Sequence, residues 1–353
     1  MEIVQIPKDA RLADWTELLH KSPNSLLFQS KQWVGLLSEY LAGVQDETLL
    51  CLDQGKMIGA LPMLAAQGPL GPVANSLPFY GSNAAFIIDP DHPNPDAIRE
   101  ALWAAWLERE KEIGAVVTVL IDTPFGDHGS FLEKYSWDYK EERIGHLTPL
   151  ADIGGGEEAE GRLYQLIHGK TRNVVKKAKK LGVTVDVTTD EADYRFLQET
   201  HEENLKAMGS SPKERPFFDK ARAMLDTRTY IGRLSGEAVA GLFLVRYHKT
   251  IEYFTPAIKK EFRSSQPLSA IIFQAMLDAA AENFAWWNWG ASWPSQENLQ
   301  LFKKRWGSVN TTYSYYIRSS VPLEDIRCLG VEGLLRGYPY FYVIPFSALA
   351  EKH

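Results

Sequence analysis

The chain has 353 residues and a formal net charge of −7, with 45% hydrophobic and 24% charged residues. At roughly 150 residues per domain, this length predicts two domains or one large one. The composition excludes wholesale disorder and low-complexity scaffolds. The two cysteines, Cys51 and Cys328, lie far apart in the chain with no second cysteine or histidine near either, which excludes a disulfide-held fold.

No apolar run approaches the ~18 residues of a membrane span, and the N-terminus lacks the pattern of a signal peptide. We therefore expect a cytoplasmic protein without a membrane span. We also expect a monomer. The first 150 residues hold 11 basic and 21 acidic residues, whereas the remainder holds 27 and 24. The acidic average argues against a general nucleic-acid binder, so we expect no DNA partner.

A weak internal repeat divides the chain into similar halves. Two strands around a turn are predicted at Gly55 and again at Gly236, 181 residues later. Each hairpin is followed by a segment of helical period that begins at a proline, Pro95 or Pro267, and then by a short hydrophobic strand. Two copies of this order predict two α+β domains built on one plan.

The polar, glycine-rich stretch 151–158 has the composition of a linker. We therefore expect an N-terminal domain over 1–153 and a C-terminal domain over 154–320. The tail, 321–353, has a helical stretch followed by a cluster of aromatic residues. Since so many aromatic side chains are unfavourable in solvent, the tail is expected to pack back on a domain.

The segment 170–180 contains six basic residues and no acid. On a helix, Arg172, Lys176 and Lys179 lie on one face. Neighbours of the same sign repel each other unless an anion offsets their charge. The pattern therefore favours a site for a phosphate-bearing ligand, and a solvated helix face is the alternative.

Two further segments are candidates for binding or catalysis. A basic turn, 259–269, leads into a helix whose N-terminal N–H groups could bind phosphate. Four tryptophans lie within 286–293, more than a short strand needs to fill a core, and Phe302 and Lys303 follow on a predicted short helix. A lysine at the edge of a core is the structural alternative for Lys303.

These segments, in this order, resemble the Fem-type (FemAB/FemX-like) aminoacyltransferases of the GNAT superfamily, in particular the branch associated with exopolysaccharide genes. The resemblance implies an α+β fold of two tandem GNAT-like domains, each a mixed sheet flanked by helices. The motifs that carry it are Phe28-Gln29-Ser30 with Trp33, the segment 77–81, the basic helix with Gly182-Val183, the segment 204–212, Asn288-Trp289-Gly290-Ala291-Ser292, and Phe302-Lys303 with Trp306-Gly307.

The resemblance implies an N-acyltransferase that moves an aminoacyl group from aminoacyl-tRNA, or another acyl group, onto an amine of a peptidoglycan or exopolysaccharide precursor. Lys303, with Phe302, would be catalytic, because a cation stabilises the oxyanion or the leaving group. The basic face would hold the phosphate of a nucleotide- or lipid-linked acceptor. The other implied substrate-binding residues are Gln29, Trp33, Tyr80 and Asn204, and the donor-side residues are Arg263, Ser264, Ser265 and Gln266.

The segment after Arg263 lacks the spaced glycines of an acetyl-coenzyme-A pyrophosphate loop, which argues against coenzyme A as the donor. We expect no tightly bound cofactor. His201-Glu202-Glu203 lacks the second histidine of the metalloprotease pattern, so no metal site is expected. No residue stands out as a general base: Glu252, Asp219, His201 and Glu202 are available, but none lies in a motif that requires one. An attacking amine loses its proton easily after bond formation, so the reaction does not demand a strong base.

Two alternatives come from other classes. An acetyl-coenzyme-A-dependent N-acetyltransferase would differ mainly in its donor. A non-catalytic protein that binds a glycan phosphate would keep the tandem fold, and it would be favoured by a Lys303 buried in an ion pair away from any cleft.

Overall fold

The computed structural model describes residues 1–5, 12–22, 24–79, 81–126 and 128–349. The chain divides into two compact units: unit 1 is Met1–Ile144 with Thr311–His353, and unit 2 is Gly145–Asn310. The sequence places the first boundary at 153/154, whereas the structure places it within a strand that runs from one unit into the other, β9 (Tyr139–Pro149). The chain passes back into unit 1 within β15 (Val309–Ser319), so the residues after 310 belong to unit 1.

Unit 1 holds two groups of strands. A four-stranded sheet has the order β1-β3-β4-β7, and β8 pairs parallel with β6 and antiparallel with β15. The elements of unit 1 are β1 (Glu2–Gln5), α1 (Leu12–His20), η1 (Leu27–Gln29), α2 (Lys31–Tyr40), β2 (Val44–Asp46), β3 (Leu49–Asp53), β4 (Lys56–Leu61), β5 (Leu64–Ala66), β6 (Val73–Ser76), β7 (Ile87–Ile88), α3 (Pro95–Ile113), β8 (Val117–Ile121), α4 (Gly129–Leu132), α11 (Leu323–Gly337) and η3 (Phe346–Ala348).

The C-terminal segment is bound to unit 1 by specific hydrogen bonds. The hydroxyl of Tyr338, a fully buried residue, accepts from the Leu70 N–H at 2.9 Å and donates to the Gly71 carbonyl at 2.8 Å. The Asn75 side chain pairs with both backbone groups of Tyr342, each at 2.8 Å. The aromatic cluster of the tail therefore packs on the segment around β6.

Unit 2 is a mixed sheet in which β10, β11, β12 and β13 are antiparallel neighbours and β14 is parallel to β13. Its elements are α5 (Ala159–Leu166), α6 (Gly169–Lys180), β10 (Thr184–Thr188), α7 (Glu191–Lys206), α8 (Arg215–Met224), β11 (Thr227–Leu234), β12 (Glu237–Tyr247), β13 (Thr250–Ile258), η2 (Lys260–Ser265), α9 (Pro267–Ala281), β14 (Trp286–Ser292) and α10 (Glu297–Arg305).

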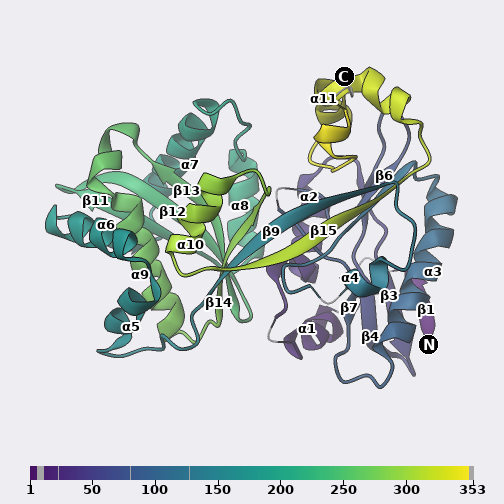
Figure 1. Cartoon of the computed structure of the whole chain (residues 1–353), viewed down its shortest axis with the longest axis horizontal. Coiled ribbons are helices and arrows are strands. Elements are labelled where there is room, and N and C mark those ends of the chain that lie inside the picture. The colour runs from purple at the N-terminus through teal and green to yellow at the C-terminus, as the bar shows by residue number, and fades with distance from the viewer. Residues whose placement is uncertain (6–11, 23, 80, 127, 350–353) are drawn as a thin grey trace. The chain divides into compact units, whose positions relative to one another are not determined.

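Helices cover both faces of the unit 2 sheet (Figure 1). The apolar residues of α5, α6 and α9 pack on one face, where alternate residues of β12 such as Ala240, Leu242 and Leu244 join the core. On the other face α7 approaches closely enough that a Cβ at Gly241 would lie 3.0 Å from Leu197. No helix among the described residues is long and apolar enough to cross a membrane.

The structure confirms the repeat at the two hairpins. In β3–β4 and in β11–β12 the strands meet at Asp53↔Lys56 and Leu234↔Glu237. Both residues of each two-residue turn have positive φ, Gln54 and Gly55 in the first and Ser235 and Gly236 in the second. Such turns match the twist of the flanking strands. Each hairpin is followed by a third antiparallel strand, a long helix and a further strand.

The parallel strands β13 and β14 pair over a short stretch. The register covers Thr250–Glu252 and Trp286–Asn288, after which β13 continues to Ile258 and β14 to Ser292. The carboxyl end of β14 is followed after a few residues by α10. This end of β14 carries the first candidate site.

Candidate functional site

Lys303 lies on α10 with only 4% of its surface exposed. Its ammonium group donates to the Gly290 carbonyl at 3.1 Å and to the Ala291 carbonyl at 2.8 Å. Burial lowers the pKa of Lys303 from 10.5 to about 8, so the side chain is mainly charged at neutral pH. A buried cation held by two carbonyls keeps one N–H available for a developing negative charge.

The end of β14 turns because of Gly290, whose φ is +70°. Before this residue the strand alternates, with Trp287 and Trp289 in the core, and the Asn288 side chain on the strand accepts from the Gly290 N–H at 2.9 Å. The turn presents two successive carbonyls to Lys303. A residue with a Cβ would be strained at this φ.

A hydrogen-bonded chain of three side chains lies beside Lys303. His146, on β9, is fully buried, and its Nε2 lies 2.7 Å from the Ser292 Oγ. Its Nδ1 lies 3.0 Å from the Asn310 Oδ1. Burial first and Lys303 second lower the pKa of His146 to about 4, so the ring is neutral at neutral pH. We refer to His146, Gly290, Ala291, Ser292 and Lys303 together as the β14 site.

Phe302 forms an apolar border of this site. It is 37% exposed and contacts the ring of Trp289 edge-on, with centroids 5.8 Å apart. Trp289 is fixed by its indole N–H, which donates to the Thr148 Oγ1 at 2.9 Å. Phe302 and Lys303, expected from the resemblance, therefore lie next to the residues of β14.

Glu252 is the last residue of β13 in the β13–β14 register, where its partner is Asn288. It is 3% exposed, and its Oε1 is buried with no hydrogen-bond partner among the described residues. Burial raises the pKa of Glu252 to about 8. The carboxyl is therefore mainly protonated at neutral pH and is a poor general base there.

The other three candidates for a general base are engaged elsewhere. Glu202 pairs with Lys206 on the surface of α7, and Asp219 lies 3.9 Å from Arg215. His201 is buried, and its Nε2 accepts from the Lys213 N–H at 3.2 Å. None of these contacts involves the β14 site.

The basic segment forms α6, with Val175 and Ala178 buried. The helix contains no acidic residue, but the neighbouring helix α5 supplies one: Glu160 pairs with Lys179 at 2.6 Å. The ammonium groups of Lys176 and Lys179 also lie 5.3 and 5.8 Å from the ring centre of Tyr164. Part of the basic face is thus neutralised internally, and Arg172 and Lys176 are left as the stronger phosphate candidates.

The expected donor segment forms a 3₁₀ helix, η2, before α9. The Gln266 N–H donates back to the Arg263 carbonyl, and the Ser265 hydroxyl donates to the Phe262 carbonyl at 2.7 Å. Arg263 and Ser264 are exposed. Because Gln266 and Ser265 donate within the turn, the segment offers few donors for a pyrophosphate.

Three of the four remaining residues drawn from the resemblance have internal partners. The Gln29 Oε1 accepts from the Leu26 N–H at 3.0 Å, and the Trp33 indole donates to the Ser82 Oγ at 3.0 Å, both inside unit 1. Asn204 pairs with both backbone groups of Ile258, at 3.0 Å each. Tyr80 lies outside the described residues.

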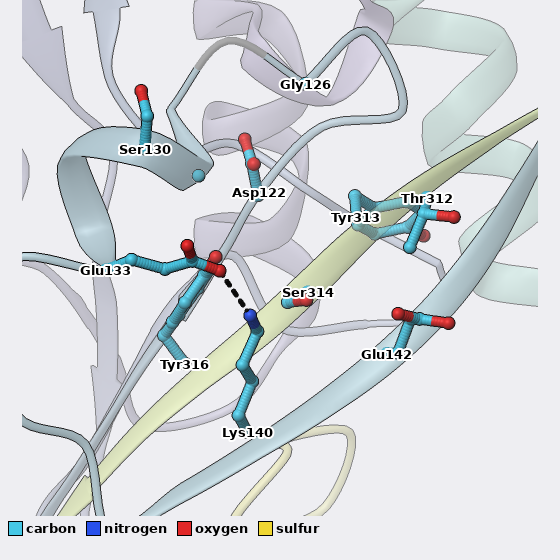
Figure 2. A pocket seen from close by; sticks show the side chains of 11 residues that line it. Asp122, Gly126, Ser130, Glu133, Lys140, Glu142, Thr312, Tyr313, Ser314 and Tyr316 are labelled. Carbon is cyan, nitrogen blue, oxygen red and sulfur yellow. Dashed lines mark hydrogen bonds and ion pairs between the residues drawn. The ribbon is translucent and has the colours of Figure 1, made fainter.

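Unit 1 has a polar pocket of about 340 Å³ that no sequence motif predicted (Figure 2). Lys140, on β9, pairs with Glu133 at 2.6 Å and lies 5.3 Å from the ring centre of Tyr316. Asp122 and Glu142 add two further carboxyl groups to the lining, and Ser130, Thr312 and Ser314 add hydroxyls. This lining suits a hydroxylated group that carries an ammonium.

No group of three or more histidine, cysteine or acidic side chains in the described part of the chain is arranged to hold a metal ion.

Comparison with known proteins covers part of the β14 site, because Gly290, Ala291 and Ser292 lie within the matched residues whereas His146 and Lys303 lie outside them. Residues 168–294 match the family model of the acetyltransferase (GNAT) domain, about a third of the chain. The crystal structure of FemX is similar over 89% of this chain and 97% of its own, at 15% identity and a TM-score of 0.70. Comparison with curated protein sequences gives no match.

A tandem GNAT protein from the clavulanic acid biosynthesis pathway, solved without AcCoA, is also similar. The similarity covers 91% of this chain and 99% of that one, at 13% identity and a TM-score of 0.53. The fold is that of tandem GNAT proteins, which confirms the prediction of two GNAT-like α+β domains. With a GNAT acetyltransferase domain in unit 2, the chain is an acyltransferase.

Proposed function

We propose that the chain is an N-acyltransferase that moves an aminoacyl or acyl group onto an amine of a peptidoglycan or exopolysaccharide precursor in the cytoplasm. The observation that carries this proposal is the buried ammonium of Lys303 at the end of β14. The likeness to FemX supports an aminoacyl donor, and aminoacyl-tRNA is the donor that we favour.

Lys303 acts as the donor to the oxyanion of the tetrahedral intermediate. A charged group placed in a dry site before the reaction needs no reorganisation as charge develops on the carbonyl oxygen. The two carbonyls fix the ammonium in position. Phe302 shields the acyl group from water, because it borders the site with an apolar ring.

The acceptor carries a phosphate that binds to Arg172 and Lys176 on α6. A guanidinium can grip a phosphate with two parallel hydrogen bonds. The η2 segment lacks glycines and uses the Gln266 N–H internally, which disfavours acetyl-coenzyme A as the donor. An acetyl-coenzyme-A-dependent N-acetyltransferase remains the second candidate, because the matched family is that of the acetyltransferases.

A non-catalytic glycan-phosphate binding protein is disfavoured by the environment of Lys303. That alternative would be favoured by a lysine buried in an ion pair, whereas among the described residues the hydrogen-bond partners of Lys303 are two carbonyls. The acyltransferase class inferred from the GNAT domain also disfavours it.

The test is a transfer assay with two donors and two acceptors. Purified protein is incubated with aminoacyl-tRNA or acetyl-coenzyme A, and with a nucleotide-linked amino sugar or peptide or the same acceptor without its phosphates. Mass spectrometry should detect an N-acylated, phosphate-bearing product with aminoacyl-tRNA. A product with acetyl-coenzyme A alone would replace the donor, and no N-acylated product with either donor would refute the proposal.

A further inference from the structure

We infer that Ser292, His146 and Asn310 form a proton relay at the β14 site, in which Ser292 takes the proton of the attacking amine and passes its own to His146. The inference rests on the proposed N-acyl transfer, and it supplies the proton acceptor that the candidate carboxylates and His201 do not provide.

The hydrogen bonds set the direction of the relay. The Oδ1 of Asn310 is a carbonyl oxygen and can only accept, so the His146 Nδ1 carries a hydrogen and donates to it at 3.0 Å. The neutral ring then has a lone pair at Nε2, 2.7 Å from the Ser292 hydroxyl. The hydroxyl must therefore donate to His146, which leaves its oxygen lone pairs directed away from the ring.

The position of Ser292 couples the relay to Lys303. Ser292 directly follows Gly290 and Ala291, whose carbonyls hold the ammonium. A short stretch of β14 thus brings a proton acceptor and an oxyanion donor to one place. Acyl transfer to an amine needs both groups, because the nitrogen becomes positive as the carbonyl oxygen becomes negative.

The steps balance as follows. The acceptor nitrogen forms a bond to the acyl carbon, and a proton moves from this nitrogen to the Ser292 Oγ as the Ser292 proton moves to the His146 Nε2. When the intermediate collapses, the acyl carbon loses its bond to the donor oxygen or sulfur. The proton on His146 returns through Ser292 to that leaving atom, and the relay is restored.

The position of the charges favours a transient role for His146. The ring is fully buried and lies near the ammonium of Lys303, which together lower its pKa to about 4, so proton transfer to His146 is uphill at neutral pH and the imidazolium lasts only until the leaving atom takes the proton. Asn310 acts through His146 and is a positioning residue, since its carbonyl holds the ring in the productive tautomer.

The first test does not depend on acyl transfer. Ser292 is only 3% exposed, so the reagent must be small. A serine whose hydroxyl donates to a neutral histidine is nucleophilic and should react with a small sulfonyl fluoride: the Oγ–S bond forms as the S–F bond breaks, fluoride leaves, and the serine proton passes to His146. Mass spectrometry should locate the label on Ser292 in the wild-type protein. The label should be lost in His146→Gln, which keeps an acceptor of similar size but cannot take the proton. No label on Ser292 in the wild type would overturn the relay.

The second test is turnover. Ser292→Ala and His146→Gln should each lower kcat by about 10²–10⁴-fold, with KM for the donor little changed, whereas Ser292→Thr should retain most activity. Ser308→Ala is the matched control, because Ser308 is another buried serine of unit 2 whose Oγ has no hydrogen-bond partner among the described residues.

The two tests separate the relay from the proposed function. A labelled Ser292 in a protein that transfers no acyl group would show that His146 activates Ser292 but would refute N-acyl transfer and, with it, the role of the pair in that reaction. Full turnover in Ser292→Ala would refute the relay and leave N-acyl transfer standing.

Discussion

Replacing Lys303 by methionine should slow catalysis strongly while preserving the fold. Burial lowers the lysine pKa from 10.5 to about 8, so keeping the side chain charged costs about 3 kcal/mol of folding free energy. Methionine removes that cost and keeps most of the volume. It also leaves the Gly290 and Ala291 carbonyls without their donor, at about 1–3 kcal/mol each.

The two effects nearly cancel, so we expect the Tm of Lys303→Met to stay within about 4 °C of the wild type. The loss of one oxyanion donor should lower kcat by about 10²–10³-fold. Thermal unfolding followed by calorimetry and the transfer assay described above measure these two quantities. Unchanged turnover would refute the catalytic role, and a loss of turnover with a fall in Tm of more than 10 °C would show that the lysine is structural.

Three further predictions follow. Since the charged form of Lys303 is lost as pH rises through about 8, kcat should fall above that pH, and Lys303→Arg should move the fall upward; rate measurements from pH 6 to 10 check this. Arg172→Ala with Lys176→Ala should weaken binding of a phosphorylated acceptor by about tenfold at low salt and less at high salt, as calorimetric titration can show. Glu142→Gln should weaken binding of glucosamine but not of glucose to the unit 1 pocket by several-fold in NMR titrations, and equal binding of both sugars to the wild type would contradict its cationic preference.

The two-domain plan of the fold could be predicted because it is encoded by patterns between residues that are close in sequence. A glycine turn at Gly55 and at Gly236, each followed by a helix that begins at a proline, can be recognised within a few dozen residues. The unit boundaries depend instead on the long strands β9 and β15, which run from one unit into the other. The alternation of apolar and polar residues along a strand does not show which unit each end of that strand belongs to.

The candidate site was predictable where its residues are close in sequence. Phe302, Lys303 and the turn at Gly290 lie within one short segment, and the resemblance drew attention to them. His146 had no such signal, because its partner Ser292 is 146 residues away in the chain. Likewise, the partner that neutralises Lys179, Glu160, comes from the preceding helix.

The most direct test of the central claim is hydrogen exchange of the wild-type protein with and without the acyl donor. Aminoacyl-tRNA, made with a non-hydrolysable amide link, should slow exchange of the amides in 288–293 and 302–306, because the acyl group lies at the β14 site. Protection confined to other segments, with neither this donor nor acetyl-coenzyme A protecting the end of β14, would contradict the account.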